Sequence, residues 1–135
     1  MNLVTRLQSF AFYTGLAMLF THELDAMPNH EWRVLPLTSF LSDSIGMDVF
    51  ILAHIPIFAV VIGCIASLNL RTRSIAQNAA SAFLIVHAAL HFAFSGHPDY
   101  EFDSLLSSVL IYGAAVLGVL FFALGGARQG SKRSL

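Results

Sequence analysis

Histidines and carboxylates that could bind a metal ion recur at helical spacings in this chain. His22 and Asp25 are three residues apart, so a helix through them would present a nitrogen and an oxygen ligand on one face. His87 and His91 are four apart, a common way for one helix to offer two nitrogen ligands. Neutral imidazole combined with carboxylate suits Zn, Fe or Mn. These spacings predict a site for a divalent transition metal, with Zn or Fe as the expected ion.

The composition places these residues in a strongly apolar protein. The chain has 135 residues, of which 56% are hydrophobic and only 11% charged, and its mean hydropathy is +0.72. An average soluble domain is about a quarter charged. The sequence therefore predicts a membrane protein whose main partner is the lipid bilayer. It has no basic cluster suited to nucleic acid, and the single cysteine, Cys64, excludes an internal disulfide.

Four long apolar runs divide the chain. They predict an all-α, integral membrane four-helix bundle, a single transmembrane domain over residues 1–135. The first run reaches full length only if its helix continues through His22–Ala26. A cleaved signal peptide is the rival interpretation of this run, but no small-x-small cleavage site precedes the cluster. The expected spans are about 7–26, 47–70, 74–96 and 104–126.

The charged residues sort by side. All eight acidic residues lie in the first and third connections or at the helix ends beside them, where only Arg33 is basic. Positive residues stay in the cytoplasm, so both termini are expected inside, in the inner (plasma) membrane of a bacterium. The other basic residues flank the termini and the second connection: Arg6, Arg71, Arg73, Arg128, Lys132 and Arg133.

The first outer connection, about 26–46, is long for a structureless loop. It has apolar content from Trp32 to Leu41 and is punctuated by Pro28 and Pro36. We expect a short interfacial helix here that covers the outer end of the bundle, with Trp32 at the membrane interface.

This topology collects all six histidines near the outer surface. Ionisable groups inside a membrane usually face the bundle interior, and binding an ion is a way to keep several together. The predicted ligands are His22, Asp25, His54, His87 and His91. His30, His97 and Asp99 are expected either as further ligands or as partners that orient the imidazole rings, and the candidate catalytic proton carriers are Glu23 and Glu31.

Simpler interpretations exist for each residue. His30 and His97 read as solvated loop residues, and His54 alone could bond a backbone carbonyl near Pro56. The pair His87 and His91 could bond water or lipid headgroups. At the level of function, the first hypothesis is a metal-dependent enzyme acting on a lipophilic or interfacial substrate. The alternatives are a metal transporter or metal-binding accessory protein, a haem protein, and a structural subunit, any of them as a homo-oligomer.

The segment HELDA (His22–Ala26), followed by HEWR (His30–Arg33), resembles a family of small, four-span bacterial membrane proteins of unknown function. It also distantly resembles the membrane proteins named for an HxxEE motif. Here Asp25 occupies the first acidic position of that motif, and Ala26 replaces the second. The resemblance implies the fold and the location of the site, and it implies no reaction.

Overall fold

The computed structural model describes residues 3–133, with side chains described through residue 127. Within this range all regular secondary structure is helical, as the sequence predicted. The four long helices are α1 (Leu3–Ala26), α2 (Asp43–Ile65), α3 (Leu70–Phe94) and α4 (Leu105–Arg133), and a 3₁₀ helix, η1 (Glu31–Arg33), lies between α1 and α2.

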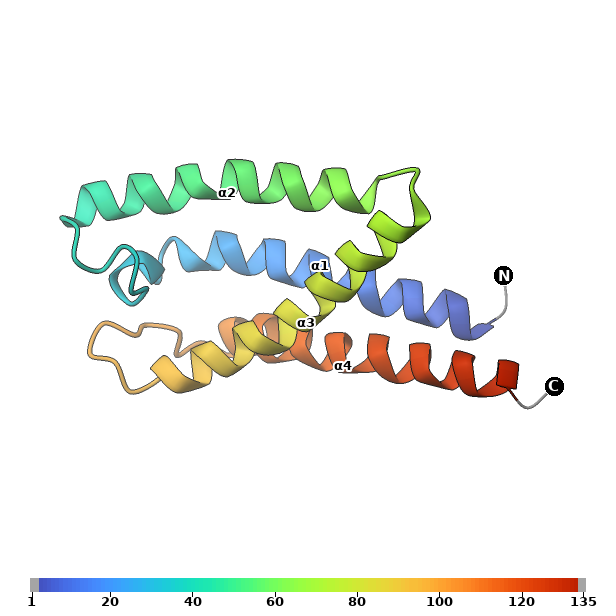
Figure 1. The fold of residues 1–135 in the computed structure, drawn as a ribbon. Helices are drawn as coiled ribbons and strands as arrows, with labels where there is room; N and C mark the ends of the chain where they lie inside the picture. The colour runs from blue at the N-terminus through green and yellow to red at the C-terminus, as the bar shows by residue number, and fades with distance from the viewer. Residues whose placement is uncertain (1–2, 134–135) are drawn as a thin grey trace.

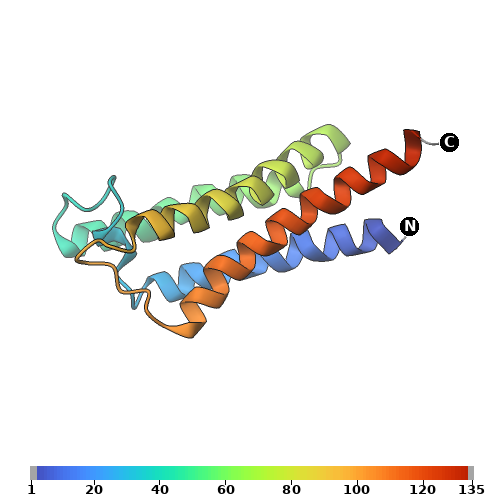
Figure 2. The same ribbon diagram turned by 90° about the horizontal axis from the view of Figure 1, so that it is seen from below.

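The helices run alternately up and down the molecule (Figure 1). Both ends of the described chain and the α2–α3 turn lie at one end, and the other two connections lie at the opposite end, as Figure 2 also shows. Contacts are most extensive between α4 and the pair α1 and α3, whereas α2 packs on α3 and η1. The α1–α2 and α3–α4 connections therefore meet at one end of the bundle.

The apolar core has two parts. One lies in the middle of α1, α3 and α4, and the other lies at the end where η1 and the two long connections meet. The first cluster comprises Phe12, Leu16, Leu19, Leu84, Ala114 and Phe121. The second comprises Ala26, Trp32, Phe50, Ala88, Phe102 and Ile111.

Among the described residues, three helical segments are long and apolar enough to cross a membrane. They are Asp43–Ile65, Leu70–Phe94 and Leu105–Ala127. Of α2, only Gly46 and Phe50 are fully buried, and most of its other residues are exposed. A large exposed apolar surface of this kind suits lipid rather than water. The structure thus supports a membrane protein with at least three candidate spans.

The tight turn between α2 and α3 is built by polar side chains. The Asn69 Oδ1 atom accepts hydrogen bonds from the backbone N–H groups of Arg71 (2.9 Å) and Thr72 (3.2 Å), which caps α3. Arg73 Nη2 donates to the backbone carbonyl of Ser67 at 2.8 Å. The second apolar run, expected to extend to residue 70, therefore leaves its helix at Ile65. The last few residues of that run form the turn.

The first long connection is more compact than the interfacial helix we expected. Only Glu31–Arg33 is helical, and turns follow it; His30, just before it, has the left-handed φ of 48°. Trp32 is buried among protein side chains. Its Nε1–H donates to Asp43 Oδ1 at 2.9 Å, and its ring lies 6.2 Å from that of Phe50. The connection covers the end of the bundle by packing Trp32 into it.

Helix α3 approaches α4 closely at Gly118. A Cβ atom added there would lie 2.7 Å from the backbone oxygen of Ser81, which cannot move aside cheaply. We expect Gly118→Ala to lower the free energy of unfolding by about 1–3 kcal/mol through overpacking. Gly63→Ala on α2 meets no atom within 4 Å and is the matched control. It is expected to be neutral or to stabilise by up to about 1 kcal/mol through helix propensity.

Thermal unfolding of the two variants in detergent, followed by circular dichroism, measures this difference. Equal midpoints for Gly118→Ala and Gly63→Ala would contradict the close α3–α4 packing.

Candidate metal centre

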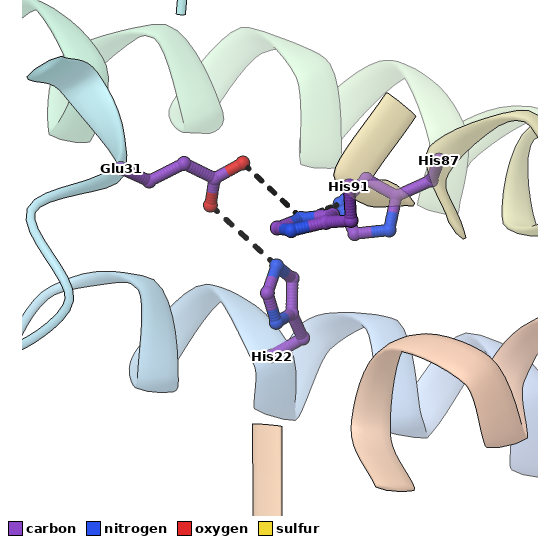
Figure 3. A group of neighbouring side chains, drawn as sticks. All are labelled: His22, Glu31, His87 and His91. Atoms are coloured by element: carbon purple, nitrogen blue, oxygen red, sulfur yellow. Dashed lines mark hydrogen bonds and ion pairs between the residues drawn. The ribbon is translucent and has the colours of Figure 1, made fainter. Parts of the chain in front are cut away.

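Three histidines and one glutamate converge at the end of the bundle where the long connections meet (Figure 3). His22 comes from α1, His87 and His91 from α3, and Glu31 from η1. One potential ligand atom from each residue lies within 4.8 Å of every other. All four side chains are buried, with exposed fractions of 0–8%. The arrangement could hold one metal ion.

The individual separations suit a common ion. The Nε2 atoms of His87 and His91 are 3.2 Å apart, and Glu31 lies 3.5 Å from His22 Nε2 and 3.7 Å from His91 Nε2. With metal–ligand bonds of about 2.0–2.1 Å, the ligand atoms of a tetrahedral site lie about 3.4 Å apart. The observed distances are close to this value, and they are long for direct hydrogen bonds.

Local structure explains how the four side chains meet. The spacing of four places His87 and His91 one turn apart on the face of α3 that looks toward α1, with ring centroids 4.6 Å apart. The ring of His22 stands edge-on to both of them, at 4.8 Å each. The turn after α1 folds back and brings Glu31 over this face. The site thus joins three separate elements of the chain.

Several polar atoms of the site are buried without a hydrogen bond among the described residues. They are both ring nitrogens of His22 and the Oε2 atom of Glu31. Leaving a buried polar group unsatisfied costs about 1–3 kcal/mol. A neutral imidazole nitrogen and a carboxylate oxygen are also the atoms that bind Zn or Fe. The donor set therefore fits a divalent metal, and such an ion would remove part of this cost.

Glu31 is held in its ionised form. Burial raises the pKa of this carboxyl, but the contact with His22 and the nearby imidazoles of His91 and His87 lower it by more. The net effect is a pKa below the usual value of 4.5. Glu31 therefore presents a carboxylate, the form that binds a cation or accepts a proton, at neutral pH.

Tyr100, from the α3–α4 connection, orients the ring of His91. Its hydroxyl lies 3.2 Å from His91 Nδ1. Burial, with smaller contributions from Tyr112, Glu31 and Asp103, raises the pKa of Tyr100 to about 12, so the hydroxyl remains neutral. When Nδ1–H donates to this oxygen, Nε2 of His91 has a free lone pair directed at the other ligands. Such outer partners set the tautomer of metal-binding histidines.

Tyr100→Phe is expected to weaken metal binding about 10–100-fold, because loss of an outer hydrogen-bond partner typically has that effect. Tyr112→Phe is the matched control, since Tyr112 is 41% exposed and outside the group. Competition with a coloured chelator measures both affinities. Equal affinities for the two variants would show that Tyr100 does not orient His91.

Two of the predicted ligands lie outside this group. His54 Nε2 is 2.9 Å from a carboxylate oxygen of Glu23, and its Nδ1–H donates to the backbone oxygen of Phe50 at 2.7 Å. Both ring nitrogens of His54 are therefore engaged elsewhere. Asp25 is close enough to His91 to interact with it electrostatically, and its Oδ2 atom is buried without a hydrogen bond. The structure does not bring Asp25 into the four-residue group.

His30, His97 and Asp99, which were predicted to assist the ligands, lie at the surface. His30 Nδ1 lies 2.7 Å from Glu101 Oε2 in a partly exposed ion pair. His97 and Asp99 are next to one another, with 3.8 Å between Nδ1 and a carboxylate oxygen. None of the three contacts the four-residue group through a hydrogen bond or ion pair described here.

Two residues of the site had not been predicted. They are Tyr100, which contacts His91, and Phe102, whose ring lies 4.8 Å from that of His91 and 5.3 Å from that of His22. Both belong to the connection Ser95–Ser104, where the sequence has no helical spacing to indicate their direction. In the sequence, only their position just after the predicted outer end of α3 indicated that they could lie near the site.

The comparisons with known proteins identify a family but no activity. No curated protein and no solved structure matches this chain. A family model matches residues 8–127, a range that includes all four residues of the candidate metal centre. On that match, the chain belongs to the family described as "Family of unknown function (DUF6713)".

Proposed function

We propose that the protein is an integral membrane metalloprotein in which His22, His87, His91 and Glu31 hold one divalent transition metal, Zn or Fe. The observation that carries this proposal is the convergence of four buried ligand atoms within 4.8 Å, three from imidazoles and one from a carboxylate. Buried ionisable groups among apolar helices are costly, and in membrane proteins they mark functional sites.

The same proposal includes a fourth membrane span formed by α1. This helix has 24 residues, about 36 Å at 1.5 Å per residue, which is enough to cross the hydrocarbon region. Its N-terminal end lies beside the α2–α3 turn, where Arg71 and Arg73 stand at the start of α3. The positive-inside rule then places both termini in the cytoplasm and the metal centre near the outer surface.

Reporter fusions test this orientation. Green fluorescent protein, which does not fluoresce when exported, should fluoresce at either terminus. Alkaline phosphatase inserted after the exposed Gly96 should be active outside the cytoplasm. If α1 does not cross the membrane, the N-terminus lies on the outer side and the N-terminal fusion stays dark.

The reaction we propose is metal-dependent and acts on a lipophilic or interfacial substrate. A divalent ion in the site would supply a Lewis acid that polarises an oxygen atom of the substrate or of water. Glu31 is the candidate proton acceptor or ligand, since its carboxylate is ionised and reaches two of the histidines. The imidazoles would orient the ion, and Trp32 and Phe102 would keep bulk water out of this end of the bundle.

The alternatives have less support from the contacts. A transport path would have to continue inward from the group, yet the adjacent core of α1, α3 and α4 is apolar, with Leu16, Leu19 and Leu84. A bis-histidine haem would need a histidine with a free nitrogen facing another across the porphyrin. His54 uses both nitrogens, and those of His87 and His91 are only 3.2 Å apart.

Elemental analysis of the detergent-purified protein tests the proposal. We expect about one equivalent of Zn or Fe per chain, and loss of the metal in the double variant His87→Ala/His91→Ala. His97→Ala, which removes a surface histidine, is the control and should retain the metal. Unchanged metal content in the double variant, in protein of native helicity, would refute the site.

A further inference from the structure

A cavity of about 600 Å³ opens beside the candidate metal centre, between the first long connection, α2 and α3. Three of the four proposed ligands, Glu31, His87 and His91, line it. The rest of its wall is mainly apolar, for example Phe50 and Leu90. A mostly apolar cavity with a few convergent polar groups is the usual form of a small-molecule site.

A second cavity, of about 450 Å³, continues along α2 away from the metal centre. The two share Glu23, His54, Ile57 and Phe83, and the second reaches Cys64. From Phe50 to Cys64, α2 extends about 21 Å at 1.5 Å per residue. The two cavities adjoin at these shared residues, so together they form a long, mainly apolar space with polar groups at the metal-centre end and at the junction.

A divalent ion at that end could bind a carboxylate oxygen. It would be held by three neutral imidazoles and the Glu31 carboxylate, and a four-coordinate zinc ion can expand to five ligands. Further along, Glu23 contacts His54 Nε2 at 2.9 Å where the two cavities meet. The remaining wall of the second cavity is apolar, with residues such as Leu16, Val61 and Ala80.

Resting on the proposed function, we propose that this space binds a long-chain fatty acid. Its carboxylate lies at the metal centre, and its alkyl chain lies between α2 and α3 toward Cys64. The ligand enters from the bilayer, since α2 is exposed along most of its length and packs less extensively than the other long helices. The long apolar space accommodates the alkyl chain, and the bond from the carboxylate to the metal ion selects the acid over a neutral lipid of the same length.

The single tryptophan provides a reporter for this binding. Trp32 is buried and packs on Phe50, which lines the first cavity. A dibrominated long-chain fatty acid, which quenches tryptophan at short range, should quench Trp32 saturably in the detergent-purified, metal-loaded protein. The unbrominated acid should compete. Quenching that rises without saturation would indicate simple partition into the micelle and would overturn the inference.

Two matched variants test where the alkyl chain of the fatty acid binds. Ala53 lines the first cavity, and Ala59 is on the same helix but lines neither. We expect Ala53→Phe to weaken fatty-acid binding at least about tenfold by filling the space, and Ala59→Phe to leave it unchanged. Equal affinities in the two variants would overturn the inference, because the ligand would then lie elsewhere.

The headgroup assignment has its own test. Removing the metal with a chelator should weaken the binding of the brominated acid at least about tenfold. The binding of its methyl ester should not change. An unchanged affinity for the acid would overturn the placement of the carboxylate. Metal content measured on the same samples separates the two proposals. A protein that holds its metal but shows no saturable quenching refutes only the fatty-acid site, whereas one that never holds metal refutes the proposed function itself.

Discussion

Replacing His22 with alanine is expected to lower the affinity for Zn or Fe by more than about 100-fold. Loss of an outer hydrogen-bond partner of a metal ligand already costs about 10–100-fold, and His22 is a proposed direct ligand. It is also the only one of the four from α1, so it ties that helix to α3. The affinity is measured by competition with a coloured chelator in detergent.

The same change should remove most of the stabilisation by metal. A ligand present at about 100 times its dissociation constant raises the free energy of unfolding by about 2.7 kcal/mol when it binds only the folded state. His30→Ala is the control, because His30 is a nearby histidine that pairs with Glu101 instead. A comparable loss of affinity in His30→Ala would show that His22 has no special role.

Acidification is expected to release the metal. Protons compete with the ion for its ligand atoms, because imidazole and carboxylate bind a metal only in their unprotonated forms. We therefore expect the affinity to fall as the pH is lowered from about 7.5 to about 4. Titrations with the chosen metal at a series of pH values measure the slope.

Glu31 contributes its charge through most of this range. Its pKa is below 4.5, so the carboxylate is ionised except at the acidic end. Its stabilising effect is present above the pKa of the unfolded chain and is lost only as the pH falls through the lower folded value. Glu31→Gln should therefore weaken binding at every pH above that value. An affinity of the unmodified protein that does not change between these pH values would contradict binding by imidazole and carboxylate ligands.

Periodicity explains why part of the site could be predicted. His87 and His91 share a face because a spacing of four repeats nearly one helical turn, whatever the rest of the fold does. His22 stands in an apolar run whose helix continues to Ala26. These three residues were predicted as ligands from the sequence, and the structure brings them together.

The remaining predictions depended on features that spacing does not encode. Asp25 shares the α1 segment with His22, but the structure does not bring it into the group. His54 is on a helix that contacts mainly α3 and η1, and its Nε2 atom lies 2.9 Å from Glu23. Glu31 was predicted as a proton carrier, and the fold places it among the histidines.

The sequence by itself determined the all-helical class, the apolar character of the helices and the gathering of histidines toward one end. These follow from local quantities, namely hydropathy, helical period and the direction of each connection. Only the tertiary structure decided which side chains meet. The turn at His30 carries Glu31 back over α1, and the α3–α4 connection brings Tyr100 to His91. In a helix, the periodicity of the sequence indicates which way each side chain points. An irregular connection has no such periodicity, so the side chains that it brings to the site depend on how it packs against the assembled helices.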